Sequence, residues 1–125
     1  MQFPTDLRYS SEHTWARRDG DRITVGITDF AQEELGEVLF VELPAVGRAI
    51  SAGESFGVVE SVKAVSDLFA PVSGTVAAVN PRLDEAPELV NQAPYGDGWM
   101  IAVEAYDPAD WQPLLSADDY RTTLT

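Results

Sequence analysis

The sequence predicts a mainly β fold with a few short helices. Apolar Ile23, Val25 and Ile27 alternate with polar or small residues, which is the period of a half-buried strand. Glycine and proline interrupt the apolar segments at short intervals, as they do between the strands of all-β folds. Helix-capping patterns are few, and two of them fall near the C-terminus. A chain of 125 residues suits one hydrophobic core, so residues 1–125 are expected to form a single domain.

The first half of the chain is expected to contain four strands and one helix. The extended segments are residues 8–10, 14–17, 23–27 and 38–43. Asp29 is the expected N-cap of the helix, because Gln32 lies three residues later, close to the spacing of a capping box. Phe30 and Leu35 form the side of this helix that is expected to be buried, and Gly36 ends it.

The second half is expected to alternate strands with turns and to end in two helices. The extended segments are residues 56–60, 64–70, 75–79 and 100–103. Residues 80–81 open a loop, and residues 87–90 form a helical turn. Asp107 and Ser116 are suitable N-cap residues, and they predict the two C-terminal helices.

Large apolar side chains within these segments are expected to form the core. Trp15, Phe40 and Trp99 are the aromatic residues assigned to it. In the strand at 56–60, alternation places Phe56 and Val58 on one face of the sheet.

The composition excludes several classes of function. The net charge is −13, from 21 Asp and Glu against 8 Lys and Arg, so nucleic acid and anionic membrane surfaces would repel the chain. The absence of cysteine excludes disulfides, a thiol nucleophile and cysteine-ligated metals. His13 is the only histidine, so neither a zinc site nor a serine-hydrolase triad is supported. The N-terminus lacks the features of a secretory signal, and a cytoplasmic protein is expected.

Lys63 is the only lysine, and it interrupts the apolar segment VESVKAVSDLFAPVSGTV at residues 59–76. A lysine on a sheet edge commonly serves only to prevent aggregation. Here predicted strands lie on both sides, so Lys63 is expected at the tip of a hairpin, pointing into solvent. The turn lacks the Asn-Gly or Gly-X pair that would specify a tight hairpin by itself.

Three segments around this lysine resemble the biotinyl/lipoyl domain superfamily: GRAISAGE at 47–54, VESVKA at 59–64 and APVSGTV at 70–76. Biotin carriers usually flank the modified lysine with methionines, whereas Val62 and Ala64 stand here, which favours lipoate. Residues 60–67, ESVKAVSD, resemble more closely the attachment site of the glycine cleavage system H proteins. The resemblance covers roughly residues 7–120, with further matching segments at 13–15, 25–29, 31–32, 35–37, 40–44, 89–91 and 94–99.

This resemblance implies a barrel-sandwich hybrid, a flattened β-barrel of two antiparallel sheets, with Lys63 exposed on a hairpin. It implies that lipoate is joined to Lys63 as an amide, and that the protein is a non-catalytic carrier with no metal site. The implied partners are a pyridoxal-phosphate glycine decarboxylase, which loads an aminomethyl group, and a tetrahydrofolate-dependent aminomethyltransferase, which removes it. A dihydrolipoamide dehydrogenase and the lipoylating enzymes complete the set.

Glu60 and Asp67 flank the lysine in the matching segment. Solubility alone could explain them; the functional alternative is recognition by the lipoylating enzymes or contact with the arm. His13 has the same two interpretations, because its position in the family motif places it near the arm and its role could also be structural.

The chain departs from the family at Thr14, where the family commonly has glutamate in His-Glu-Trp. In the family that glutamate is associated with holding the amine of the loaded arm in a surface cleft. Glu12 and Glu34 are the two carboxylates that could replace it. Glu12 is the first choice, because alternation along a strand would place residues 12 and 14 on the same face.

Three other functions are compatible with these patterns. One is a lipoyl or biotinyl domain of a different complex, although neither Met-Lys-Met nor Asp-Lys-Ala with a Pro/Ala-rich linker is present. Another is a lipoyl relay, in which an H-like protein donates its lipoyl group to other acceptor proteins through the same lysine. The third is a binding module without a cofactor.

Overall fold

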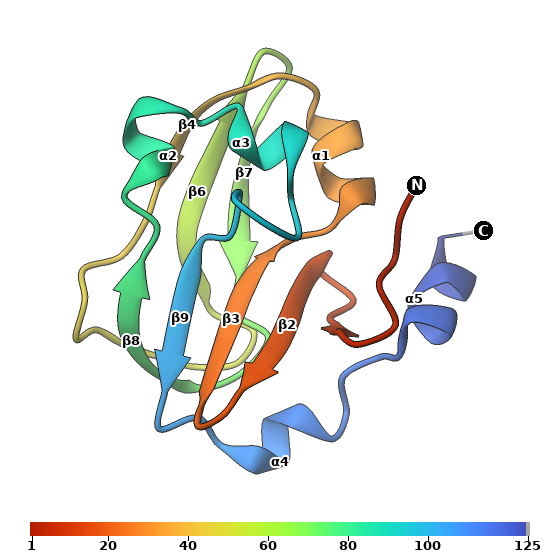
Figure 1. Cartoon of the computed structure of the whole chain (residues 1–125), viewed down its shortest axis with the longest axis vertical. Helices are drawn as coiled ribbons and strands as arrows, with labels where there is room; N and C mark the ends of the chain where they lie inside the picture. Colours follow the sequence, from red (N-terminus) through yellow and green to blue (C-terminus); the bar gives the residue numbers. More distant parts are fainter. Residues whose placement is uncertain (125) are drawn as a thin grey trace.

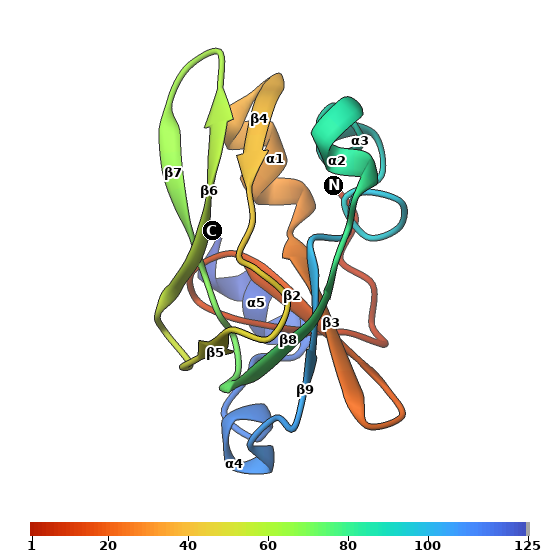
Figure 2. The ribbon, with the colours of Figure 1, turned by 90° about the vertical axis from the view of Figure 1, so that its left-hand side faces the viewer.

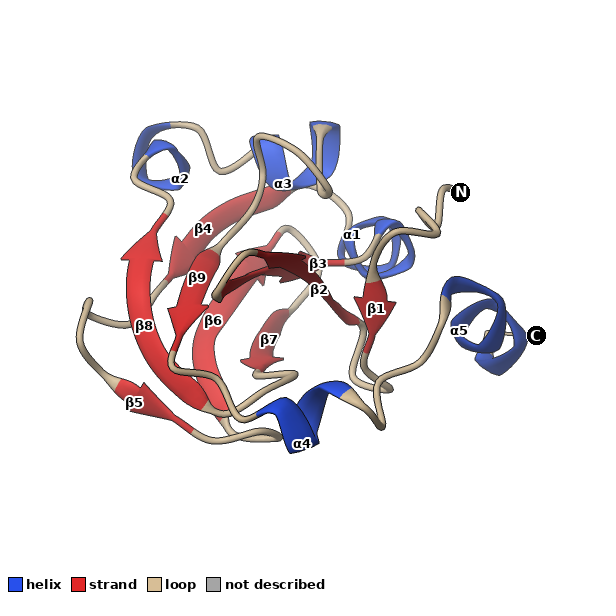
Figure 3. Cartoon of the chain, turned by 60° about the horizontal axis from the view of Figure 1, so that its bottom comes forward, coloured by secondary structure: helices blue, strands red, loops and turns tan. Residues whose placement is uncertain are grey.

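The computed structural model describes residues 1–124 and contains two antiparallel sheets (Figures 1 and 3). The larger sheet has six strands in the order β1-β2-β3-β9-β8-β5, and the smaller has three in the order β4-β6-β7. The strands are β1 (Arg8–Tyr9), β2 (Thr14–Asp19), β3 (Arg22–Ile27), β4 (Val38–Glu42), β5 (Ala49–Ile50), β6 (Ser55–Ser61), β7 (Val65–Phe69), β8 (Gly74–Val79) and β9 (Ile101–Glu104). The mainly β prediction is confirmed, although the sheets do not join into a closed barrel within these residues.

The helices of the described chain are short: α1 (Asp29–Leu35), α2 (Arg82–Glu85), α3 (Leu89–Gln92), α4 (Pro108–Trp111) and α5 (Ala117–Thr123). Asp107 and Ser116 cap α4 and α5 as predicted, because their side-chain oxygens accept backbone N–H bonds from the first turn. The loop expected after Asn80 is in part the helix α2, whose first amide donates to the Asn80 side chain. Within residues 1–124, no helix has the length and apolar character needed to cross a bilayer.

The start of α1 differs from the prediction. Thr28, rather than Asp29, is the N-cap, and its Oγ1 accepts the Ala31 N–H at 3.2 Å. The Asp29 carboxylate instead accepts a bond from the Gln32 side chain at 2.7 Å. Threonine and aspartate are both good caps, so the local sequence could not decide between two adjacent positions. Phe30 is only partly buried, because its side of α1 lines a surface cleft.

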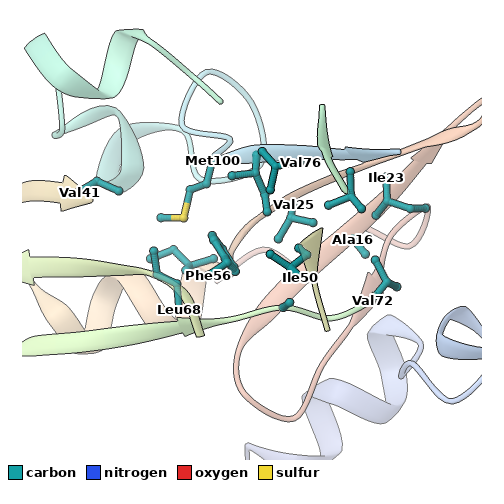
Figure 4. Close-up of a cluster of buried hydrophobic side chains, with 14 of the residues drawn as sticks. Ala16, Ile23, Val25, Val41, Ile50, Phe56, Leu68, Val72, Val76 and Met100 are labelled. Carbon is teal, nitrogen blue, oxygen red and sulfur yellow. The ribbon is translucent and has the colours of Figure 1, made fainter. Parts of the chain in front are cut away.

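The main hydrophobic core lies between the two sheets, where side chains from strands of both meet (Figure 4). On β6 the buried apolar residues are Phe56 and Val59, which are 1% exposed each, so the alternation predicted for residues 56–60 is wrong. The cause is a register shift between Ser55 and Gly57, which changes the face that each following residue occupies. At this irregularity, a Cβ on Gly57 would overlap the Glu42 carbonyl of β4.

Phe40 is the one predicted core aromatic that the fold leaves outside. It is 52% exposed, whereas Trp15 is fully buried and Trp99 packs partly buried against a second cluster. The register of β4 against β6 shifts between Val38 and Phe40, so Val38 and Val41 face the core and Phe40 does not. Phe40 pairs with Glu60 on the neighbouring strand, and both side chains are exposed.

The second hydrophobic cluster attaches α5 to the six-stranded sheet. Its buried members are Leu7, Tyr9, Trp15, Ala117 and Tyr120. The rings of Tyr9 and Tyr120 stack at 4.9 Å with an interplanar angle of 9°. This packing carries Tyr120 of the C-terminal helix to the start of β2.

The hairpin of β6 and β7 projects beyond the rest of the fold, at the top of Figures 1 and 2, and α1 lies beside it. The hairpin predicted from the strands on both sides of Lys63 is therefore present. This arrangement leaves the lysine turn and one side of α1 next to each other at the surface.

Candidate functional site

A buried serine builds the turn that carries Lys63. Ser61 ends β6, and its backbone N–H donates to the Ala64 carbonyl at 2.8 Å. Its Oγ accepts the N–H groups of Lys63 and Ala64, both at 3.2 Å. Serine side chains stabilise turns in this way, which explains a tight hairpin without an Asn-Gly pair. The Val62 N–H donates to the Glu37 carbonyl at 3.0 Å and ties the turn to the segment after α1.

The Lys63 side chain is exposed and lies over the C-terminal end of α1. Its Nζ is 3.5 Å from the Glu34 carbonyl oxygen, a long hydrogen bond. Gly36, with φ +73°, follows the helix, and a Cβ built there would lie 3.4 Å from Lys63 Cε. Among residues 1–124, no carboxylate forms an ion pair with the Lys63 amine. The amine is therefore accessible to a reagent from solvent.

A cleft of about 300 Å³ lies between α1 and the hairpin, on the side toward which the lysine folds. Its lining comes from the start of β2, the end of β3, one side of α1 and the strands β6 and β7: Glu12, His13, Thr14, Ile27, Phe30, Ala31, Glu34, Leu35, Val59, Ser66, Asp67 and Leu68. Buried Ile27, Val59 and Leu68 form an apolar floor. Glu12, Glu34 and Asp67 make the exposed rim acidic. The volume is at the lower end of small-molecule sites.

The cleft runs along β7, away from the lysine turn. The Glu34 main chain lies at the lysine end, because its carbonyl oxygen meets Lys63 Nζ, whereas the Glu34 carboxylate acts on His13. The other end is marked by Thr14, whose hydroxyl donates to the Phe69 carbonyl at 3.1 Å. From Val65 to Phe69 a strand advances roughly 13 Å. Glu12 at the far end is thus suited to meet the tip of a long group attached to Lys63.

His13 forms part of the wall near the far end. Its Nδ1 lies 2.7 Å from the Tyr120 hydroxyl, and its ring packs against Phe30 with centroids 5.0 Å apart. Burial lowers the pKa of His13 below its ordinary value, while the nearby carboxylates of Glu12 and Glu34 act in the opposite direction. The backbone of His13 has φ 69°, a conformation that is uncommon for residues other than glycine.

The structure brings together most of the residues singled out from the sequence. Glu12, His13, Glu34 and Asp67 all line the cleft next to the lysine turn. Glu60 does not: neighbouring Val59 faces the cleft, and the Glu60 side chain points to the opposite, exposed face of the small sheet.

Residues 12 and 14 do not share the face of one strand, so the alternation that favoured Glu12 is wrong. Strand β2 begins at Thr14, and the positive φ of His13 interrupts the extended chain before it. Thr14 is 1% exposed, and its hydroxyl contacts Ser10 Oγ at 2.7 Å as well as the Phe69 carbonyl. Its hydrogen-bonding capacity is used inside the fold. Glu12 nevertheless lines the cleft, through the path of the chain rather than through strand geometry.

Three residues with roles at this site had no functional interpretation from the sequence. Ser61 organises the lysine turn, Thr28 caps α1, and Tyr120 holds His13. The first two could have been found from turn and cap chemistry. Tyr120 could not, because 107 residues separate it from His13 in the sequence.

Known proteins of one family match this chain over nearly its whole length. The family described as Glycine cleavage H-protein matches residues 7–125. A glycine cleavage system H protein of Anaeromyxobacter sp. (strain K) is 59% identical over 121 residues, which is 97% of this chain and 94% of that protein. A probable glycine cleavage system H protein of Haloarcula marismortui is 61% identical over 121 residues, with 97% and 95% covered. The crystal structure of such a protein from Mycobacterium marinum has a TM-score of 0.87 and 41% identity, and the match covers 97% of this chain and 98% of that one.

Proposed function

Because this chain belongs to the glycine cleavage H-protein family, we propose that it carries lipoate as an amide on Lys63, within one domain spanning residues 1–125. It is the lipoyl carrier of the glycine cleavage system, and it shuttles the aminomethyl group of glycine. Glycine decarboxylase loads that group, and the tetrahydrofolate-dependent aminomethyltransferase removes it. Dihydrolipoamide dehydrogenase and the lipoylating enzymes are the other partners. The chain acts in the cytoplasm as a non-catalytic component.

The presentation of Lys63 is the observation that carries this proposal. Acylation requires an amine that an enzyme can reach, and the Lys63 amine is exposed on a projecting hairpin and has no carboxylate partner among residues 1–124. The turn around it is fixed by Ser61, so the amine is displayed at a defined position. When bound, lipoate supplies a disulfide whose opening lets one sulfur accept the aminomethyl group, which no side chain of a cysteine-free chain could do.

The cleft fits the group that Lys63 is proposed to carry. Ile27, Val59 and Leu68 offer an apolar surface to an aliphatic arm. The carboxylates at the rim offer charge-assisted hydrogen bonds to the ammonium of the cargo. Glu12 holds this ammonium at the far end of the cleft, and Glu34 and Asp67 add negative charge along the way. Enclosure between α1 and β7 keeps water away from the cargo between partners.

Replacement of the lysine tests the proposal. Lys63→Arg keeps the positive charge but has no amine that can be acylated, so carrier activity in a reconstituted glycine cleavage assay should be lost completely. Since the side chain is exposed, the free energy of unfolding should stay within about 0.5 kcal/mol of the parent.

A matched control tests whether a lysine elsewhere in the chain can replace Lys63. The double variant Lys63→Arg with Arg48→Lys restores one lysine to the chain, at an exposed site whose ion pair with Glu54 is 3.7 Å long. It should remain inactive and without lipoate. Carrier activity in either variant would show that the function does not depend on Lys63.

A further inference from the structure

A chain of hydrogen bonds connects the N-terminus of α1, the C-terminal helix α5 and the wall of the cleft. The Ala31 N–H donates to Thr28 Oγ1 at 3.2 Å. Thr28 Oγ1 lies 2.8 Å from the Tyr120 hydroxyl, and that hydroxyl lies 2.7 Å from His13 Nδ1. Thr28 and Tyr120 are both 0% exposed, so neither hydroxyl has water as an alternative partner.

Burial fixes the direction in which the hydrogens of these hydrogen bonds point. A threonine hydroxyl has one hydrogen to donate, and within residues 1–124 the Thr28 hydroxyl contacts only the Ala31 N–H and the Tyr120 hydroxyl. The Ala31 N–H can only donate, so the Thr28 hydrogen has to go to Tyr120. Tyr120 then donates its own hydrogen to His13 Nδ1. The reverse direction would leave the Thr28 hydrogen buried without an acceptor, which native structures avoid.

We propose that Thr28 and Tyr120 form a directional relay that holds His13 as the neutral Nε2–H tautomer, and that this keeps the wall of the cleft free of positive charge so that the cleft accepts a cationic amine. An imidazolium carries hydrogens on both ring nitrogens and could not accept the Tyr120 hydrogen. Thr28 and Tyr120 are positioning residues, because they act through His13. The relay stands on the hydrogen bonds alone; only the identity of the amine as the aminomethyl cargo rests on the proposed function.

The negative charges of Glu12 and Glu34 oppose the relay. The carboxylates of Glu12 and Glu34 face His13 and favour its protonated form, whereas burial disfavours it. Without the Tyr120 hydrogen at Nδ1, the two carboxylates would more readily favour the protonated form of His13. A protonated His13 would then stand beside the ammonium of the cargo and repel it.

The main-chain geometry supports a positioned rather than an incidental histidine. His13 has φ 69°, and both of its backbone groups are held: its N–H donates to the Ser10 carbonyl at 3.2 Å, and its carbonyl accepts the Thr28 N–H at 3.1 Å. No described side-chain atom is both buried and unpartnered, so Nε2, which has no partner within residues 1–124, is accessible. In the neutral tautomer proposed here, Nε2–H is therefore an accessible donor on a residue that lines the cleft.

Nitrogen NMR of the imidazole ring tests the relay in the unlipoylated protein, where His13 is the only histidine and its signals are unambiguous. The parent should show the Nε2–H tautomer at neutral pH and should protonate below the ordinary histidine pKa of about 6.5. In Tyr120→Phe the tautomer preference should weaken and the pKa should rise. Tyr95→Phe is the matched control: the Tyr95 hydroxyl also bonds the start of α1, through the Asp29 N–H, but does not touch His13.

An Nδ1–H tautomer in the parent at neutral pH would overturn the relay, even if Tyr120→Phe failed to fold. The functional half is tested by loading the lipoylated proteins and timing cargo loss without partners. Relative to the parent, Tyr120→Phe should lose cargo several-fold faster, with the ratio growing as the pH falls toward about 6.5, and Tyr95→Phe should not. Equal rates, with the NMR result as predicted, would leave the relay in place and refute its role toward the cargo. Absence of lipoate on Lys63 would refute the proposed function without altering the NMR result.

Discussion

Neutralising Glu12 should shorten the lifetime of the cargo on the carrier. If Lys63 carries loaded lipoate, the aminomethyl group would leave as its nitrogen lone pair forms a C=N bond and the C–S bond breaks, with the electron pair going to sulfur. A protonated nitrogen has no lone pair to use. A carboxylate next to the amine stabilises the protonated form, and Glu12 lines the end of the cleft that lies farthest along β7 from Lys63. Glu12→Gln preserves shape and hydrogen-bonding capacity while removing the charge.

The expected magnitude follows from the bond that changes. A hydrogen bond to a charged group contributes about 1.5–3 kcal/mol, and one between neutral groups about 0.5–1.5 kcal/mol. The midpoints of these ranges differ by about 1.2 kcal/mol, which corresponds to about one pKa unit of the amine. Glu12→Gln should therefore raise the fraction of unprotonated amine, and with it the rate of cargo loss, about tenfold.

The assay times the release of formaldehyde, formed when the departing iminium is hydrolysed, from loaded protein in buffer without partners. Glu34→Gln should have a smaller effect, because the main chain of Glu34 lies at the lysine end of the cleft, although its carboxylate acts on His13 as that of Glu12 does. Glu33→Gln is the matched control, since Glu33 is exposed on the same helix but does not line the cleft. If Glu12→Gln and Glu34→Gln both lose cargo at the rate of the Glu33→Gln control, the carboxylates do not hold the amine.

Two further predictions concern the fold. Gly57→Ala should lower the free energy of unfolding by about 1–3 kcal/mol in denaturant titrations, because the new Cβ would overlap the Glu42 carbonyl; an unchanged midpoint would show that β4 and β6 move apart freely. Burial raises the pKa of Tyr9 above its ordinary value and that of Tyr95 to about 12. Since a raised pKa gives stability below the unfolded-state value, that stability should be lost as the pH rises from about 10 toward 12. Ionisation of Tyr9 and Tyr95, followed by ultraviolet absorbance against the Tyr9→Phe and Tyr95→Phe variants, should coincide with unfolding in that range, and ionisation of either near pH 10 with the fold intact would contradict the burial argument.

The parts of the fold that local patterns specify were predictable. Side-chain caps at Asp107 and Ser116 act within one helical turn, so their residues identify α4 and α5 directly. The hairpin at Lys63 followed from the two strands on either side of it. Besides the choice between Thr28 and Asp29 as the cap of α1, what failed depends on pairing between strands: the register shifts that bury Val59 and expose Phe40 have no signature within a single strand.

The site also has a part that local sequence predicted and a part that depends on contacts between distant segments. Lys63 and Asp67 lie on one hairpin, so the matching segment located them together. The cleft itself needed α1 and the residues before β2 to meet that hairpin, and the strand argument for Glu12 was wrong because His13 breaks the extended chain. Tyr120 reaches the cleft only because its helix packs on the larger sheet, a contact that spans most of the sequence.

The modification state of Lys63 tests the central claim most directly. The protein should be isolated from its native host under conditions in which other host proteins carry lipoate, digested, and analysed by peptide mass spectrometry. We expect a lipoyl amide on the Lys63 side chain and on no other side chain, since the chain has no second lysine. An unmodified Lys63 in such a preparation would contradict the assignment of this chain as a lipoyl carrier.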